Sequence, residues 1–245
     1  MSANAIPKTL ILTHLRDKPP FQLNLERCTK LWELRDPAFA GEPFKRRVSL
    51  TGEGSQLPDG LTRRPGDLKI FSFTGAIDDR TIPPEYEGTE IEFQPAVDFG
   101  FAGPGYNRFV LGGGNVEFCL LKTFESLVRE KTQQGEPLEV LIPLMMVYFH
   151  DDISQPETYI TKPNHYSRFL EKALNEEDPR KLAIDSCRIS VDGSVVFGQL
   201  YPQQPTVQLH WFTTPIGMFS SPFFPETRNN PAALKRLIDY FSDAN

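Results

Sequence analysis

Residues 106–131, YNRFVLGGGNVEFCLLKTFESLVREK, decide the fold that this sequence predicts. Residues 107–111 are apolar and strand-like, and three glycines at 112–114 then turn the chain. Apolar residues recur at helical spacing over positions 116–128, with charged residues largely on the opposite side. Asn115 is a suitable N-cap for that helix. The stretch therefore predicts a strand, a tight turn and an amphipathic helix.

The next segment predicts a second strand that runs parallel to the first. Residues 138–149, LEVLIPLMMVYF, are almost continuously apolar, which is typical of a strand buried on both faces of a parallel sheet. Strand, helix and strand then form one right-handed βαβ unit. Pro143 lies inside the run and indicates an edge position, a bulge or a strand shorter than the run.

The remaining segments extend this unit into an α/β fold. We expect a mostly parallel central sheet with helices on both faces, plus an antiparallel hairpin region in the C-terminal quarter, in one domain over residues 1–245. A loop-rich excursion covers about residues 37–67 and either serves a function or hides a strand at 47–50. The predicted strands are 8–15, 68–74, 90–93, 182–191, 194–200 and 207–213, the last extending the antiparallel part, and the predicted helices are 23–34, 164–175 and 231–243.

Composition and charge exclude several classes of protein. The chain has 245 residues, 39% hydrophobic and 24% charged, with a net charge of −6, which does not favour nucleic-acid binding. The basic cluster at 45–47 is expected on a solvated loop, with an anionic ligand as the alternative. No apolar run reaches about 18 residues, so no membrane span is expected. The N-terminus lacks a signal-peptide cleavage site.

Three cysteines, Cys28, Cys119 and Cys187, are widely spaced and lack a CxxC pair. This pattern argues against a disulfide framework and a structural zinc site, and it favours the cytoplasm. Cys28 and Cys187 are expected in the core. Cys119 falls in the first turn of the predicted helix, where a thiolate is stabilised, although a packed small side chain is the alternative.

Polar residues follow the predicted parallel strands where ligands bind in open α/β sheets. His14 and Asp17 follow the first strand, and Cys119 follows the glycine turn. A third group, His150 with Asp151 and Asp152, follows residues 138–149. If these strands are neighbours, a thiol, a base and an orienting carboxylate meet at one edge. The backbone and side chains expected to bind substrate are those of Gly112, Gly113, Gly114, Asn115 and Glu117.

Residues 109–124, FVLGGGNVEFCLLKTF, resemble the nucleophile segment of isochorismatase-like cysteine hydrolases. Gly113, Glu117, Cys119 and Thr123 fit that segment. The resemblance implies a doubly wound fold with Cys119 as the nucleophile. The chain departs from the family pattern at the end of the first strand, where Thr13 and His14 stand in place of an aspartate, with Asp17 three residues on. The upstream lysine has no match either, and the hairpin-rich C-terminus is foreign to the family.

The leading hypothesis is a cytosolic hydrolase or transferase that acts on a small amide- or amidine-like substrate without a cofactor. Cys119 attacks, His14 or His150 acts as base, and Asp17 or Asp151 orients that base. The glycine run matches neither standard phosphate-binding pattern. One alternative is a non-enzymatic binding protein whose residues 215–224 form an exposed aromatic contact. Another is a divalent-metal hydrolase using His150, Asp151 and Asp152.

Overall fold

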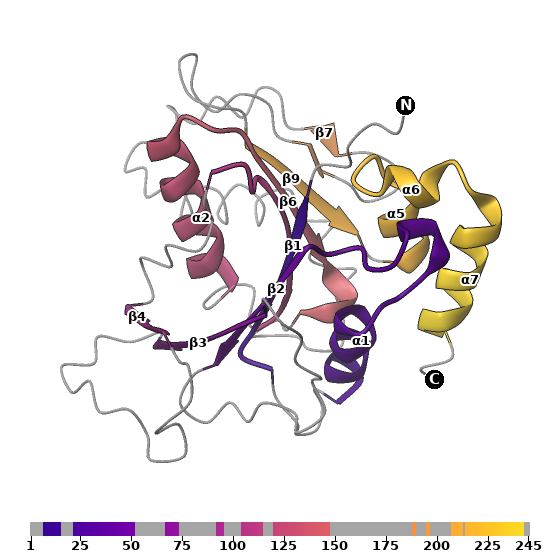
Figure 1. The fold of residues 1–245 in the computed structure, drawn as a ribbon, viewed down its shortest axis with the longest axis horizontal. Coiled ribbons are helices and arrows are strands. Elements are labelled where there is room, and N and C mark those ends of the chain that lie inside the picture. The colour runs from indigo at the N-terminus through magenta and orange to yellow at the C-terminus, as the bar shows by residue number, and fades with distance from the viewer. Residues whose placement is uncertain are drawn as a thin grey trace.

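The structure is a computed structural model that describes ten ranges of the chain: 7–15, 22–51, 67–73, 92–95, 104–114, 120–147, 188–189, 195–196, 207–212 and 214–242. Their main feature is a seven-stranded sheet in which every pairing is parallel (Figure 1). Its strands are β1 (Lys8–Thr13), β2 (Arg46–Thr51), β3 (Leu68–Phe73), β4 (Glu92–Pro95), β5 (Arg108–Gly113), β6 (Leu138–Pro143) and β9 (Val207–Phe212).

The strand order places a change of direction at the centre of the sheet. The order is β4-β3-β2-β1-β5-β6-β9, so the chain moves outward from β1 to β4 and then returns to the other side of β1 with β5. A doubly wound sheet has its topological switch point where the order reverses, and that point is between β1 and β5. The predicted α/β class is confirmed.

Helices cover both faces of the sheet, as the sequence predicts (Figure 1). One face carries α2 (Leu121–Gln134), the crossover from β5 to β6, and is called the α2 face. The other, the α1 face, carries α1 (Gln22–Trp32), α5 (Pro215–Ser220), α6 (Pro225–Arg228) and α7 (Pro231–Ser242). The 3-10 helices η1 (Pro37–Phe39) and η4 (Leu144–Met146) follow α1 and β6.

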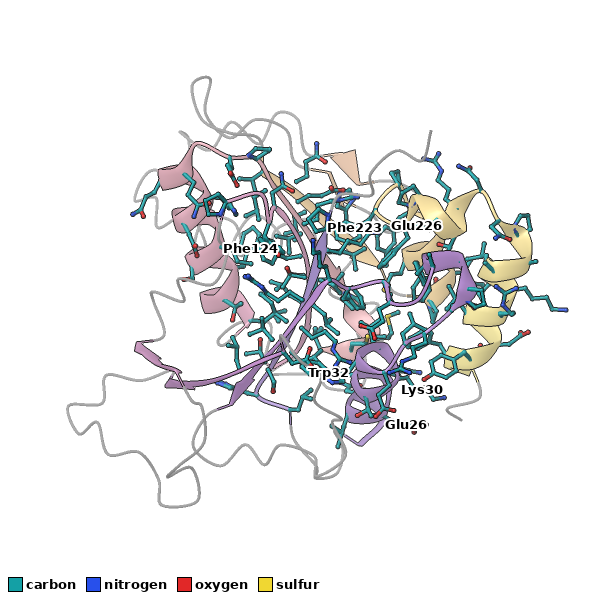
Figure 2. All side chains as sticks on the ribbon, in the orientation of Figure 1. Glu26, Lys30, Trp32, Phe124, Phe223 and Glu226 are labelled. Atoms are coloured by element: carbon teal, nitrogen blue, oxygen red, sulfur yellow. The ribbon has the colours of Figure 1, made fainter. Side chains whose placement is uncertain are left out.

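Aromatic and aliphatic side chains fill the core between the sheet and the α1 face. Leu10 and Leu12 of β1 belong to one buried cluster with Trp32, Phe223 and Phe241. On the α2 face, Phe124 extends from α2 toward the sheet and is fully buried, as Figure 2 shows. All six residues of β1 and of β5 are buried, because each central strand is covered on both faces.

The structure decides three further predictions. Pro143 is the last residue of β6, so the strand is shorter than the apolar run, and η4 follows it. The excursion at 37–67 does contain a strand, β2. The basic cluster is solvated only in part: Lys45 is exposed, whereas Arg47 is buried, stacks on Trp32 and forms an ion pair with Asp67.

Two predictions for the C-terminal quarter are wrong. Residues 207–213 were expected to extend an antiparallel sheet, but β9 pairs parallel to β6 and joins the central sheet. In the described part of this quarter, antiparallel pairing is limited to the two-residue ladder of β7 (Arg188–Ile189) with β8 (Val195–Val196). Residues 215–224 are not an exposed aromatic contact, because Phe219, Phe223 and Phe224 are fully buried.

The helix predicted at 231–243 is confirmed as α7, in which Asn230 Oδ1 accepts a hydrogen bond from the Ala233 amide. The helix predicted at 164–175 lies outside the described residues. Over the ranges given above, no helix combines the length and apolar character needed to cross a membrane.

Candidate functional site

The candidate site is the carboxyl edge of the sheet where β1 and β5 end side by side. Thr13 and Gly113 are register partners at this edge. Gly113 and Gly114 have φ angles of 69° and 64°, in the left-handed region that favours glycine. A Cβ atom on Gly113 would lie 2.6 Å from the Thr13 carbonyl oxygen. The two strand ends therefore meet backbone to backbone, and this contact requires glycine.

His14 turns the chain at the end of β1. Its φ is 45°, unusual for a residue with a side chain, and its amide donates a hydrogen bond to the Leu50 carbonyl at 2.8 Å. That bond ties the turn to the end of β2, and the half-buried imidazole follows directly after Thr13. The structure thus places His14 beside the glycine turn, as the sequence predicts for two strands that are neighbours.

A clamp between α1 and η4 closes the α1 face of this edge. Three consecutive carbonyls each accept a hydrogen bond from an α1 side chain. Asn24 Nδ2 donates to Val147 at 2.8 Å, Arg27 Nη1 to Met145 at 3.4 Å, and Cys28 Sγ to Met146 at 3.4 Å. The clamp fixes the start of the segment that leads to His150.

Cys28 is the cysteine that the structure places next to the glycine turn. Its side chain is fully buried, and a Cβ on Gly112 would lie 3.7 Å from its sulfur. Burial raises the pKa of the Cys28 thiol to about 12, although a hydrogen bond from the Gly113 backbone acts in the opposite direction. A thiol that stays protonated at neutral pH is a packing group, not a nucleophile. The prediction that Cys28 lies in the core is confirmed.

The raised pKa of Cys28 gives an expected pH dependence of stability. The unfolded thiol loses its proton near pH 9.0, whereas the folded one keeps it until about 12. Between these values the unfolded state binds fewer protons, so the free energy of unfolding falls by up to about 1.4 kcal/mol per pH unit. Urea titrations across this pH window should show that the free energy of unfolding falls less steeply with pH in Cys28→Ala than in the parent. An identical slope in the variant and the parent would contradict the assignment.

The predicted site residues divide into two groups. The structure brings together His14, Gly112, Gly113 and Gly114 at the β1/β5 edge. The helix α2 is described from Leu121 onward. The other members of the predicted site lie outside the described residues and remain predictions: Asp17, Asn115, Glu117, Cys119, His150, Asp151 and Asp152, and with them Cys187.

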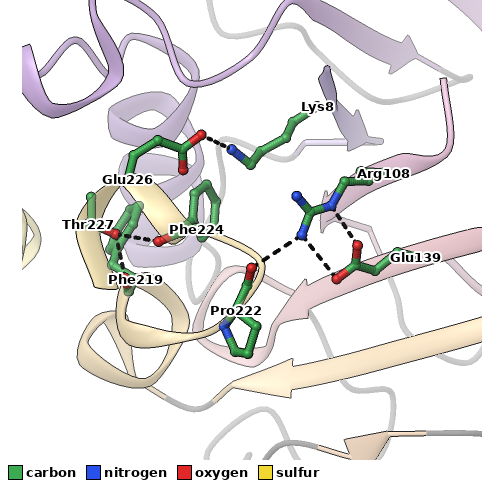
Figure 3. Close-up of polar contacts among 8 residues, drawn as sticks. All are labelled: Lys8, Arg108, Glu139, Phe219, Pro222, Phe224, Glu226 and Thr227. Carbon is green, nitrogen blue, oxygen red and sulfur yellow. Dashed lines mark hydrogen bonds and ion pairs between the residues drawn. The ribbon is translucent and has the colours of Figure 1, made fainter. Parts of the chain in front are cut away.

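A buried ionic cluster, which the sequence did not reveal, lies at the opposite, amino-terminal end of the strands (Figure 3). Glu139 bridges Arg108 and His210: its oxygens lie 2.5 Å from Arg108 Nε and 3.3 Å from His210 Nε2. Lys8 Nζ lies 2.6 Å from Glu226 Oε1. These five residues are called the ionic cluster. A signal for it existed, because single charges interrupt the apolar strands at positions that share the α1 face.

The ionic cluster anchors the C-terminal segment to the sheet. Arg108 Nη2 donates to the Pro222 carbonyl at 3.4 Å and its guanidinium lies over the Phe223 ring, with 4.6 Å from Cζ to the centroid. Burial favours the neutral form of Glu139, but hydrogen bonds from His210 and Arg108 outweigh burial and lower its pKa. Burial lowers the pKa of Lys8 despite its bond to Glu226. Because its charged groups are paired with one another and packed against aromatic rings, we assign the ionic cluster a structural role.

The described residues include no group of three His, Cys, Asp or Glu side chains arranged to hold a metal ion. Comparison of the chain with protein-family models, with curated proteins and with solved structures gives no match.

Proposed function

We propose that this protein is a hydrolase or transferase that acts on a small polar substrate at the β1/β5 carboxyl edge. The observation that carries the proposal is the reversal of strand order between β1 and β5, which sets His14 beside Gly113 and Gly114. Ligands of open α/β sheets bind in the crevice at such a switch point. His14 supplies an ionisable group of the kind that transfers protons near neutral pH.

The nucleophile in this proposal is Cys119. Of the three cysteines, Cys28 is excluded by its full burial and its raised pKa. Cys119 directly precedes Leu120 and is five residues from Gly114 along the chain. The thiolate attacks an amide- or amidine-like carbon, the leaving group takes a proton from the imidazolium, and water or an acceptor then releases the acyl group. Backbone amides of the glycine turn stabilise the oxyanion.

Native-state alkylation with mass-spectrometric peptide mapping tests the nucleophile. At about pH 6, Cys119 should react with iodoacetamide within minutes, because a catalytic thiolate has a depressed pKa. Cys28 is the internal control and should react only after unfolding. A Cys119 that is protected in the folded protein as fully as Cys28 would contradict the proposal. Cys119→Ala should then abolish turnover of any amide or ester substrate found for the parent.

A further inference from the structure

We propose that the Thr13 hydroxyl binds the ligand at the β1/β5 edge, and that the ligand presents an uncharged hydrogen-bonding group to it. This inference rests on the location of the site in the proposed function, not on its chemistry. Thr13 is 1% exposed, and its Oγ1 has no hydrogen-bond partner among the described residues. A buried polar atom without a partner is costly and calls for an explanation.

A comparison with Thr9 separates Thr13 from an ordinary unpaired hydroxyl. Thr9 and Thr13 both lie on β1, alternate with Leu10 and Leu12, and have buried Oγ1 atoms without a partner. Asn107 lies on β5's side of Thr9, two residues before the register partner of Thr9 and on the same face of the sheet. Its Oδ1 is also buried and has no partner among the described residues. A hydroxyl and an amide on adjacent strands can satisfy each other by a small rotation or through one water.

Thr13 has no such neighbour in register. Its partners across the sheet are Leu50 and Gly113, and neither side chain has a polar atom. Thr13 is also the last residue of β1, so its hydroxyl lies at the edge where a switch-point ligand approaches. The clamp of α1 on residues 145–147 closes the α1 face of that edge, whereas Thr13 lies on the α2 face.

The surroundings of Thr13 select an uncharged ligand group. On the α2 face near this end of the sheet, Ile11, Leu50 and Leu111 are buried and apolar, and the buried polar residue in the first turn of α2, Thr123, carries no charge. A charge placed among them without a counter-charge costs several kcal/mol of desolvation. The charged side chains of the ionic cluster lie at the other end of the strands. A carboxamide or a hydroxyl therefore fits, and a carboxylate does not.

Acetamide and acetate are the probes that test this inference. We would titrate each into the isotope-labelled protein and follow backbone amide shifts by NMR. Acetamide should give saturable shifts at Thr13, His14 and Gly113, and acetate should not. Thr13→Val should weaken acetamide binding about threefold to tenfold, the worth of one hydrogen bond. Thr13→Ser keeps the hydroxyl and should bind as the parent does.

Thr9→Val is the matched control, because it removes an equivalent hydroxyl from the far end of the same strand. It should leave acetamide binding unchanged, and both valine variants should melt no lower than the parent. Equal binding by Thr13→Val and the parent, no shifts with acetamide, or equal binding of acetate would each overturn the inference. Binding that depends on Thr13 together with an inert Cys119 would overturn only the proposed chemistry.

Discussion

Replacing Gly113 by alanine is expected to destabilise the fold by about 2–5 kcal/mol. The φ of 69° alone costs an alanine about 1–2 kcal/mol. The new Cβ would also lie 2.6 Å from the Thr13 carbonyl oxygen and 2.8 Å from a Leu15 methyl, so the strand ends must separate. Urea denaturation followed by circular dichroism measures the loss.

Gly135 provides the matched control for Gly113. It has the same φ of 69°, but among the described residues beyond its own chain neighbours no atom lies within 4 Å of the position that its Cβ would take. Gly135→Ala should therefore cost only the conformational part, about 1–2 kcal/mol. If the two variants lose the same stability, the close approach of β1 and β5 is not what requires glycine at 113.

The second large effect is expected at the centre of the ionic cluster. Glu139→Gln should lower the free energy of unfolding by about 3 kcal/mol, because it leaves the buried Arg108 guanidinium without its counter-charge. The parent should show a related loss in acid. Its Glu139 has a lowered pKa, so the stability present above the ordinary value of 4.5 is lost as the pH falls through the lowered value.

Glu42→Gln is the control for this substitution. Glu42 forms an exposed pair with Arg35 at 4.0 Å, and the Arg35 side chain is 68% exposed. Surface pairs of this kind contribute little to stability. Chemical denaturation at neutral pH should therefore separate the two variants clearly. A Glu139→Gln protein that is as stable as Glu42→Gln would show that solvent screens the ionic cluster.

Local sequence patterns were sufficient to predict the helices that bury one face and the strands that are buried on both faces. The βαβ unit over 106–143 and the helix α7 follow from apolar runs and helical spacing, which depend on neighbours along the chain. The sequence predicts His14 beside the glycine turn only on the condition that the two strands are neighbours, because strand order depends on contacts between distant residues. That condition is met by the pairing of β1 with β5.

The prediction for β9 failed because of the ionic cluster. The alternation of Gln208 and His210 with apolar residues is typical of a half-exposed antiparallel strand. His210 is nevertheless only 5% exposed, because β9 pairs parallel to β6 and the His210 ring lies beside Glu139, with 3.3 Å between Nε2 and Oε1. A buried polar contact between strands gives a strand the same sequence pattern as solvent does. The phenylalanines of residues 215–224 were predicted to be exposed because the sheet surface that covers them is distant in the sequence, so no local pattern indicates their burial.

The covering of β1 by the last helices has a consequence for synthesis on the ribosome. Leu10 and Leu12 pack in one cluster with Phe223, Phe224 and Phe241, which lie about 200 residues later in the chain. The intervening chain must be translated before that contact can form. Nascent chains will therefore leave part of this apolar surface uncovered until the C-terminal helices are made, the condition under which chaperones bind and aggregation begins. Non-local strand pairing such as β6 with β9 is also expected to slow folding.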